Sequence, residues 1–195
     1  MHRNIRNFFS KLTLFFWLFT ASWVLQVQAA SFAYIANSGG NSISIIDTTS
    51  NTVTDTVFSD YAPYGVAVNP TGARVYLTNP DNNSVSVLDT STNTVIATIP
   101  SVGVHPHCVA INQAGTKAYA AADGNNTITV IDTATNTVVD TIPSAGNGLF
   151  SLVVHPTGSK IYATNMNDGT VSVVDTTTKT VIPFLNQRCY NMSTK

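Results

Sequence analysis

The sequence predicts an all-β fold made of repeated four-stranded antiparallel sheets, and three observations support this prediction. First, VIDTATNTVVDTIP at 130–143 nearly copies VLDTSTNTVIATIP at 87–100. Second, one aspartate and one tyrosine recur every 42 or 43 residues, namely Asp47, Asp89, Asp132 and Asp175, and Tyr34, Tyr76, Tyr119 and Tyr162. Third, each period contains four short apolar runs separated by turn residues. A period of ~40–50 residues is typical of β-propeller blades.

The second copy shows the content of one period most clearly. Its apolar runs are GVAVN at 65–69, RVYLT at 74–78, SVSVLD at 84–89 and TVIATI at 94–99. Their length, β-branched content and alternation favour strands, and none is long enough for a helix. Each repeat is therefore predicted to be a four-stranded antiparallel meander.

The third run of each copy indicates how the sheets pack. Val85 and Val87 point to one face of the predicted strand, and Ser86 and Leu88 point to the other. The other copies follow the same pattern, so both faces of each sheet are partly apolar. This favours sheets sandwiched between neighbours, as in radially stacked blades.

The repeated segment D-T-x-[ST]-[NK]-T joins the third and fourth strands and has the chemistry of a turn. Its aspartate can accept backbone N–H groups two residues on. Asn51, Asn93 and Asn136 suit the left-handed conformation of a tight hairpin, although Lys179 replaces Asn in the last copy. One carboxylate per blade cannot supply the roughly 6–8 oxygens that Ca²⁺ requires, so these aspartates are not expected to bind metal.

Residues 1–30 are predicted to be a signal peptide. Arg3, Arg6 and Lys11 precede an uncharged apolar run, and cleavage is expected after Ala29 or Ala30. An uncleaved membrane anchor is the alternative reading. Export places the protein in the periplasm, in the medium or on the cell surface.

The charge of the remaining chain argues against one class of partner. Without the first thirty residues, six basic residues face ten aspartates and no glutamate, which gives a net charge of −4. A protein that neutralises phosphates has the opposite sign. Nucleic acid is therefore an unlikely partner.

Copies such as RVYLTNPDNNSVSVLDTSTNTVIATIP resemble the YVTN family of β-propeller repeats, which occurs in YncE-like periplasmic proteins and in surface-layer proteins. The resemblance covers residues 31–185 and leaves an aberrant C-terminal tail at 186–195. It departs from the pattern at Ala122, which replaces an Asn, and at Cys108 and Ser151, which replace the Gly of Gly65. The resemblance implies a ring of about seven blades, whereas this chain holds about four.

The predicted number of strands is fifteen, because the first copy lacks its innermost strand. An incomplete or short propeller of this kind would leave apolar faces and strand edges uncovered. Two explanations stay open. Either a homo-oligomer completes the propeller, or the chain is a shortened relative.

No catalytic residues and no cofactor are expected. The sequence lacks G-x-S-x-G, H-E-x-x-H, a glycine-rich phosphate loop and the C-x-x-C-H of covalent haem. His155 aligns with turn asparagines. His105 and His107 lack a nearby carboxylate or third ligand in the sequence, so no metal site is predicted. A disulfide between Cys108 and Cys189 is allowed but unsupported by spacing, and a free, buried Cys108 is expected.

One repeat position suggests a ligand-binding site. Tyr64, His107 and Phe150 occupy the same place in successive copies, immediately before the predicted inner strand. In a propeller this place lies near the mouth of the central channel. The three rings either form a recognition surface or plug the channel entrance.

The predicted function is that of an exported, non-enzymatic scaffold that binds a protein or small ligand through its blade loops. One alternative is a propeller enzyme of the lactonase or dehydrogenase-subunit type. The other is an inactive, truncated fragment of a larger propeller.

Overall fold

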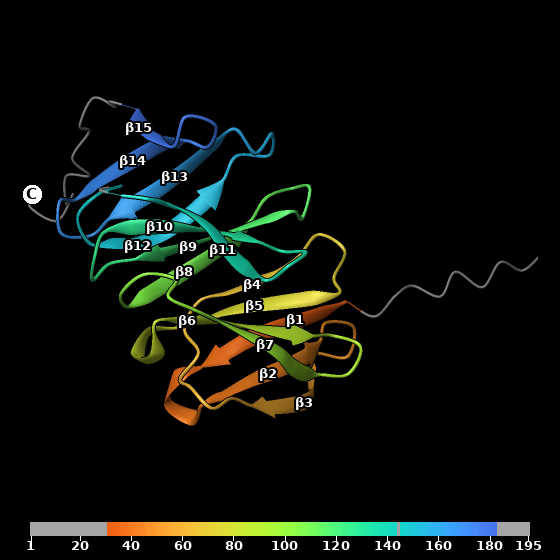
Figure 1. Ribbon diagram of the computed structural model, residues 1–195. Helices are drawn as coiled ribbons and strands as arrows, with labels where there is room; N and C mark the ends of the chain where they lie inside the picture. Colours follow the sequence, from red (N-terminus) through yellow and green to blue (C-terminus); the bar gives the residue numbers. More distant parts are fainter. Residues whose placement is uncertain (1–30, 144, 183–195) are drawn as a thin grey trace, which may run out of the picture.

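The computed structural model describes residues 31–143 and 145–182, which form four antiparallel sheets stacked in chain order (Figure 1). This confirms the all-β prediction. The only helical segments within these residues are two single 3-10 turns, η1 (Ser38–Gly40) and η2 (Pro80–Asn82). The predicted signal peptide at 1–30, the tail at 186–195 and Cys189 lie outside the described residues.

The sheets are the blades of a propeller and are numbered here in chain order. Blade 1 has three strands and the other blades have four, as predicted. Blade 1 contains β1 (Phe32–Asn37), β2 (Ser42–Asp47) and β3 (Thr52–Phe58), and blade 2 contains β4 (Val66–Val68), β5 (Arg74–Asn79), β6 (Ser84–Asp89) and β7 (Thr94–Pro100). Blade 3 contains β8 (Pro106–Ile111), β9 (Lys117–Ala122), β10 (Thr127–Asp132) and β11 (Thr137–Ile142), and blade 4 contains β12 (Leu149–Val154), β13 (Lys160–Asn165), β14 (Thr170–Asp175) and β15 (Thr180–Ile182).

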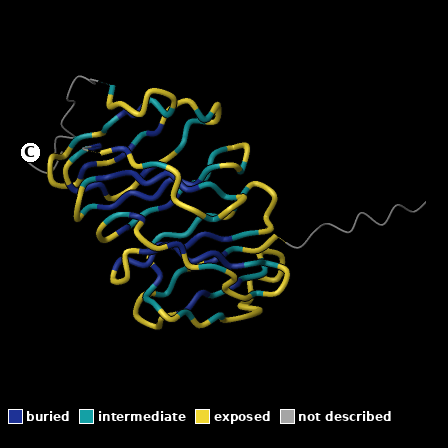
Figure 2. The backbone as a smooth tube through the Cα atoms, in the orientation of Figure 1, coloured by how far each residue is buried: buried dark blue, intermediate teal, exposed yellow. Residues whose placement is uncertain are grey.

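Three apolar layers hold the blades together, one between each pair of neighbours. Between blades 2 and 3, for example, Tyr76 and Val85 of blade 2 pack with Ala118 and Ile131 of blade 3. Both faces of β6 are buried as a result (Figure 2). The predicted sandwiching of the inner sheets is therefore confirmed.

The end blades each leave one apolar face uncovered. Val85 and Ile128 are fully buried, whereas Val171 at the same repeat position of blade 4 is 39% exposed. At the other end, Ile35 of blade 1 is 45% exposed, whereas the equivalent Leu77 of blade 2 is fully buried. Blades 1 and 4 lie at opposite ends of the stack in Figure 1, so the described residues do not close into a ring.

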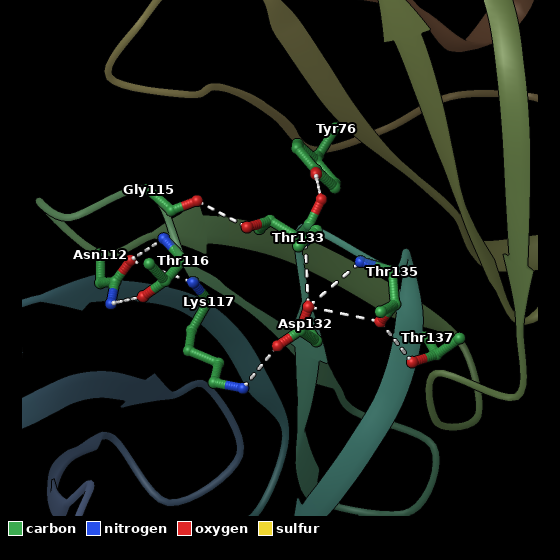
Figure 3. A network of polar contacts seen from close by, with 10 residues as sticks. Tyr76, Asn112, Gly115, Thr116, Lys117, Asp132, Thr133, Thr135 and Thr137 are labelled. Atoms are coloured by element: carbon green, nitrogen blue, oxygen red, sulfur yellow. Dashed lines mark hydrogen bonds and ion pairs between the residues drawn. The ribbon is translucent and has the colours of Figure 1, made fainter.

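The repeated Asp-Thr segment forms the predicted turn. In blade 3, Asp132 Oδ1 accepts the backbone N–H groups of Ala134 and Thr135 at 3.0 and 3.1 Å, and its other oxygen accepts a hydrogen bond from Lys117 (Figure 3). The Thr133 hydroxyl donates to the carbonyl of Gly115 at 2.6 Å and so ties this turn to the preceding one. Each part of the motif serves the hairpin, which explains its repetition.

In blades 2, 3 and 4, the residue that ends the turn also contacts the preceding blade. Asn93 of blade 2 donates to Asp55 of blade 1 at 2.9 Å. Lys179 adopts the same left-handed conformation as the asparagines, with φ 58°, and pairs with Asp140 of blade 3. Lysine therefore replaces asparagine where the facing partner is again an aspartate. Between blades 2 and 3, the Tyr76 hydroxyl instead donates to Asn136 Oδ1 at 3.2 Å.

Within the described ranges, no helix has the length and apolar character needed to cross a bilayer.

Candidate functional site

The inner strands of blades 2, 3 and 4 begin close together, and β8 of blade 3 contacts both of its neighbours. A Cβ atom added to Gly65, just before β4, would lie 2.5 Å from the carbonyl oxygen of His107. Thr78 Oγ1 donates to the same oxygen at 3.2 Å. On the other side, the Cys108 thiol lies 3.8 Å from the carbonyl oxygen of Leu152 in β12. The backbone of β8 is thereby fixed between two blades.

Two of the three predicted ligand-binding residues are bulge residues. Pro106 and Cys108 pair with consecutive residues of β9, so His107 has no partner of its own, and Phe150 is skipped in the same way between β12 and β13. A bulge re-aims the side chain of the extra residue. The expectation that these residues precede the inner strand is wrong for His107 and Phe150, which lie within β8 and β12, and holds for Tyr64.

The structure brings the three rings together. The centroid of the His107 ring lies 4.8 Å from that of Tyr64 and 5.1 Å from that of Phe150. Tyr64 and Phe150 meet edge to face, with centroids 6.3 Å apart. These distances are within the range of favourable aromatic pairs. Tyr64 remains 46% exposed and Phe150 37% exposed, so the cluster presents apolar surface to solvent.

A carboxylate that the sequence analysis missed bridges the two histidines. Asp123 Oδ1 lies 3.0 Å from His105 Nδ1, and Asp123 Oδ2 lies 3.2 Å from His107 Nε2. The prediction that these histidines lack a nearby carboxylate is therefore wrong. Among the residues that the structure describes, this is the only group of three metal-ligating side chains within reach of one another.

The loop between blades 2 and 3 positions His105. Its backbone N–H donates to Asn83 Oδ1 at 2.8 Å, and its carbonyl oxygen accepts the N–H of Asp123 at 3.4 Å. The residue adopts a left-handed conformation with φ 57°. Gly148, at the same repeat position of the next copy, also has a positive φ and also bonds an asparagine, Asn126. A β-carbon at this position costs energy that glycine avoids.

One of the two contacts with Asp123 is a hydrogen bond. An ionised carboxylate only accepts hydrogen bonds, so His105 donates through Nδ1. His107 Nε2 lies 3.2 Å from Asp123 Oδ2, and His107 Nδ1 is buried without a hydrogen-bond partner among the described residues. The His107 ring is accordingly held by Asp123 and by its aromatic neighbours alone.

Comparison of the repeat copies contains a signal for this group. Two of its positions depart from the other copies at once: His105 stands where Ala62 and Gly148 occur, and Asp123 stands where Pro80 and Met166 occur. Only blade 3 therefore carries titratable groups at both places. One residue that differs from the other copies is weak evidence for a functional site. Several such differences within a single blade are stronger evidence.

A cavity of about 250 Å³ adjoins the cluster. Its lining includes Tyr64, Asp81 and both histidines. A separate cavity of about 300 Å³ is lined by the repeated turn residues Asp47, Thr90 and Asn93 near the opposite end of the strands. Asp47 and Thr90 recur in every copy and serve the fold, so the first cavity is the better candidate for a functional site.

The other residues considered in the sequence have structural surroundings. His155 Nδ1 lies 2.8 Å from Thr157 Oγ1 in the turn before β13, as expected for a turn residue. Cys108 is half-buried, and its thiol is directed to the carbonyl of Leu152 in blade 4.

No protein-family model and no curated protein matches the chain. Among solved structures, 1316 chains match, and a fold so common does not indicate any single activity. One match is to hydrazine synthase of Kuenenia stuttgartiensis, with 31% sequence identity and a TM-score of 0.73. It covers 78% of this chain and 45% of that chain, so this chain spans less than half of the length of the matched protein.

Proposed function

We propose that the chain is an exported, non-enzymatic β-propeller protein that binds a small aromatic ligand where the inner strands of blades 2, 3 and 4 begin. The observation that carries the proposal is the cluster of Tyr64, His107 and Phe150 beside a cavity of about 250 Å³. Ligand sites are typically concave and lined by apolar and aromatic groups with a few polar ones. The cavity combines Tyr64 with the polar groups of Asp81 and the histidines.

The solvent exposure of Tyr64 and Phe150 supports a role in ligand recognition rather than a role in plugging the channel entrance. The repeated tyrosines Tyr76 and Tyr119 are almost fully buried between blades, as expected of residues that serve the fold. Tyr64 and Phe150 are 46% and 37% exposed, although they lie at a position where three blades meet. Exposed aromatic side chains are favoured at binding surfaces because they bury a large area with few rotatable bonds.

The location and the family are parts of the same proposal. The basic and apolar character of residues 1–30 supports export by a signal peptide, with the protein in the periplasm or on the cell surface. The repeated Tyr-x-x-Asn and Val-x-Val-x-Asp-Thr segments support membership of the YVTN repeat family.

Ligand-observed NMR with indole and p-cresol as probes would test the proposal. The native protein should broaden and saturate the probe signals, and the double variant Tyr64→Ala/Phe150→Ala should lose this effect. Phe58→Ala is the matched control, because Phe58 is 78% exposed and lies in β3, outside the cluster. An unchanged signal from the folded double variant would refute the site.

An enzyme is the second candidate, and one observation favours it: the matched solved structure is named as a synthase. The match leaves out more than half of that chain, so the name does not transfer to this one. Reproducible turnover by the purified protein, abolished by substitution in the cavity, would favour an enzyme over a binding protein.

A further inference from the structure

We propose that His105, His107 and Asp123 bind one divalent late first-row transition metal ion, of the class of Zn²⁺. The metal site shares His107 and the adjoining cavity with the aromatic-ligand site of the previous proposal, but it stands whether or not that ligand binds. It rests on the geometry of the three side chains, on their donor chemistry and on the backbone of His105.

The three side chains already approach the spacing of a metal site. With metal–ligand bonds of ~2.0–2.1 Å and tetrahedral geometry, neighbouring ligand atoms lie about 3.3 Å apart. The carboxylate oxygens of Asp123 lie 3.0 and 3.2 Å from the two imidazole nitrogens. All of the ligand atoms lie within 4.8 Å of one another. Binding an ion therefore requires an adjustment of side chains only over a short distance, and the His105 ring is the exposed member of the group.

The donor set selects the class of metal. Two imidazoles and one carboxylate suit Zn²⁺ and its late transition-metal neighbours, whereas Ca²⁺ and Mg²⁺ prefer oxygen ligands. The nitrogens that face Asp123, His105 Nδ1 and His107 Nε2, would coordinate the ion through their lone pairs. Each neutral ring would then carry its proton on the other nitrogen.

The backbone at His105 supports a role beyond packing. A histidine occupies a left-handed position, with φ 57°, where the equivalent residue of the next copy is Gly148. Strained positions held by residues other than glycine persist when the side chain or its surroundings require them. The imidazole is 47% exposed and thus contributes little to the core, and its contacts are with Asp123 and, edge to face at 4.6 Å between centroids, with the His107 ring.

The site would keep a position open toward the cavity. Both histidines line the cavity of about 250 Å³, and three protein ligands leave the fourth place of a tetrahedral ion free. Asp81 lies in the same lining and adds a carboxylate to this cavity. Water or a small anion would complete the coordination.

Calorimetric titration of chelator-treated, purified protein with Zn²⁺ tests the proposal. We expect one ion per chain. His105→Gly and Asp123→Asn should each weaken binding by at least ~10–100-fold, the cost of losing even an outer-sphere partner. His105→Gly suits the left-handed backbone and should therefore fold well. His155→Ala and Asp168→Asn are the controls, because these residues lie in turns outside the group.

Titration with Co²⁺ adds a readout of the ligand type through its visible absorption. Nitrogen and oxygen ligands give d–d bands without a thiolate charge-transfer band, whereas binding to Cys108 would produce one. The proposal is overturned if the native protein binds no stoichiometric Zn²⁺. It is also overturned if the controls weaken binding as much as His105→Gly does, or if the thiolate band appears.

Discussion

The carbonyl oxygen of His107 occupies the space in which Gly65 would carry a side chain. A Cβ atom at Gly65 would lie 2.5 Å from this oxygen and 3.0 Å from Cys108 Cα. The inner strands of blades 2 and 3 are therefore in backbone contact beside the aromatic cluster. The other copies carry Cys108 and Ser151 at the equivalent position. Glycine is therefore required by the contact between blades 2 and 3 and not by the repeat itself.

Gly65→Ala should push the two strands apart and destabilise the protein by about 1–3 kcal/mol, the usual cost of overpacking. Chemical denaturation measures the change. Gly39→Ala is the matched control, because nothing lies within 4 Å of the added Cβ atom. Equal stability of the Gly65→Ala and Gly39→Ala variants would contradict the role of this contact.

Asn79→Ala should be destabilising by about 1–3 kcal/mol, because it removes hydrogen bonds within the buried core of blade 2. The Asn79 side-chain amide donates to Ser84 Oγ and Ser86 Oγ, both at 2.9 Å, and the residue is fully buried. Asn37 makes the same pair of bonds in the end blade, where they are only partly buried. Thermal unfolding should therefore show a larger loss for Asn79→Ala than for Asn37→Ala, and the reverse order would refute this explanation.

Acidification should weaken the turn of blade 3. The hydrogen bond from Lys117, followed by the backbone N–H of Thr135, lowers the pKa of Asp132 from 3.8 to about 2. A carboxyl group whose pKa is lower in the folded state stabilises the fold above its unfolded pKa. This contribution should be lost as the pH falls from about 4 through about 2.

Carboxyl NMR of the folded protein would measure the pKa of Asp132 directly. Lys117→Met removes the first cause and should move the pKa back toward 3.8. If the pKa of Asp132 is the same in the Lys117→Met variant, the ion pair is not its cause.

The uncovered end faces should drive self-association of two chains. The face of blade 4 around Val171 and the face of blade 1 around Ile35 correspond to the two sides of a normal contact between neighbouring blades. Two copies joined end to end would form a ring of eight blades. Light scattering should show a dimer, and Val171→Lys should shift it toward monomer.

Val95→Lys is the control for assembly. Val95 is 37% exposed, close to the value of Val171, but it lies in the outer strand of a middle blade. A stable, monodisperse monomer of the native protein at micromolar concentration would contradict the predicted dimer.

Much of the fold could be predicted because it follows from local and repeated features. The strand β6 has the predicted bounds, and the left-handed asparagines of the turns were identified from their residue type. The gathering of Tyr64, His107 and Phe150 follows from their common repeat position once the sheets are known to stack. The residue types of the hairpin turns and the period of the repeat can both be read from the sequence, and they predict the strands and the turns.

The partner of the histidines could not be predicted in the same way. Asp123 lies 18 residues beyond His105 and meets it across two loops, through a contact that no periodicity reports. The bulge at His107 is also invisible in the sequence, because the pairing shift depends on the contact between β8 and β9. Both features concern how blade 3 differs from its copies. Comparison of the copies marks His105 and Asp123 as departures, but only the folded structure shows that these two residues meet.

The turn contacts differ from one junction between blades to the next. Asn93 of blade 2 donates a hydrogen bond to an aspartate of blade 1, Asn136 of blade 3 accepts one from a tyrosine of blade 2, and Lys179 of blade 4 forms an ion pair with Asp140 of blade 3. Sheets of nearly identical sequence could otherwise dock in any order during folding. At the repeat position of Asp55 and Asp140, blade 2 carries Ala97, so Lys179 docked on blade 2 would lose its carboxylate partner and this contact favours the native order of the blades.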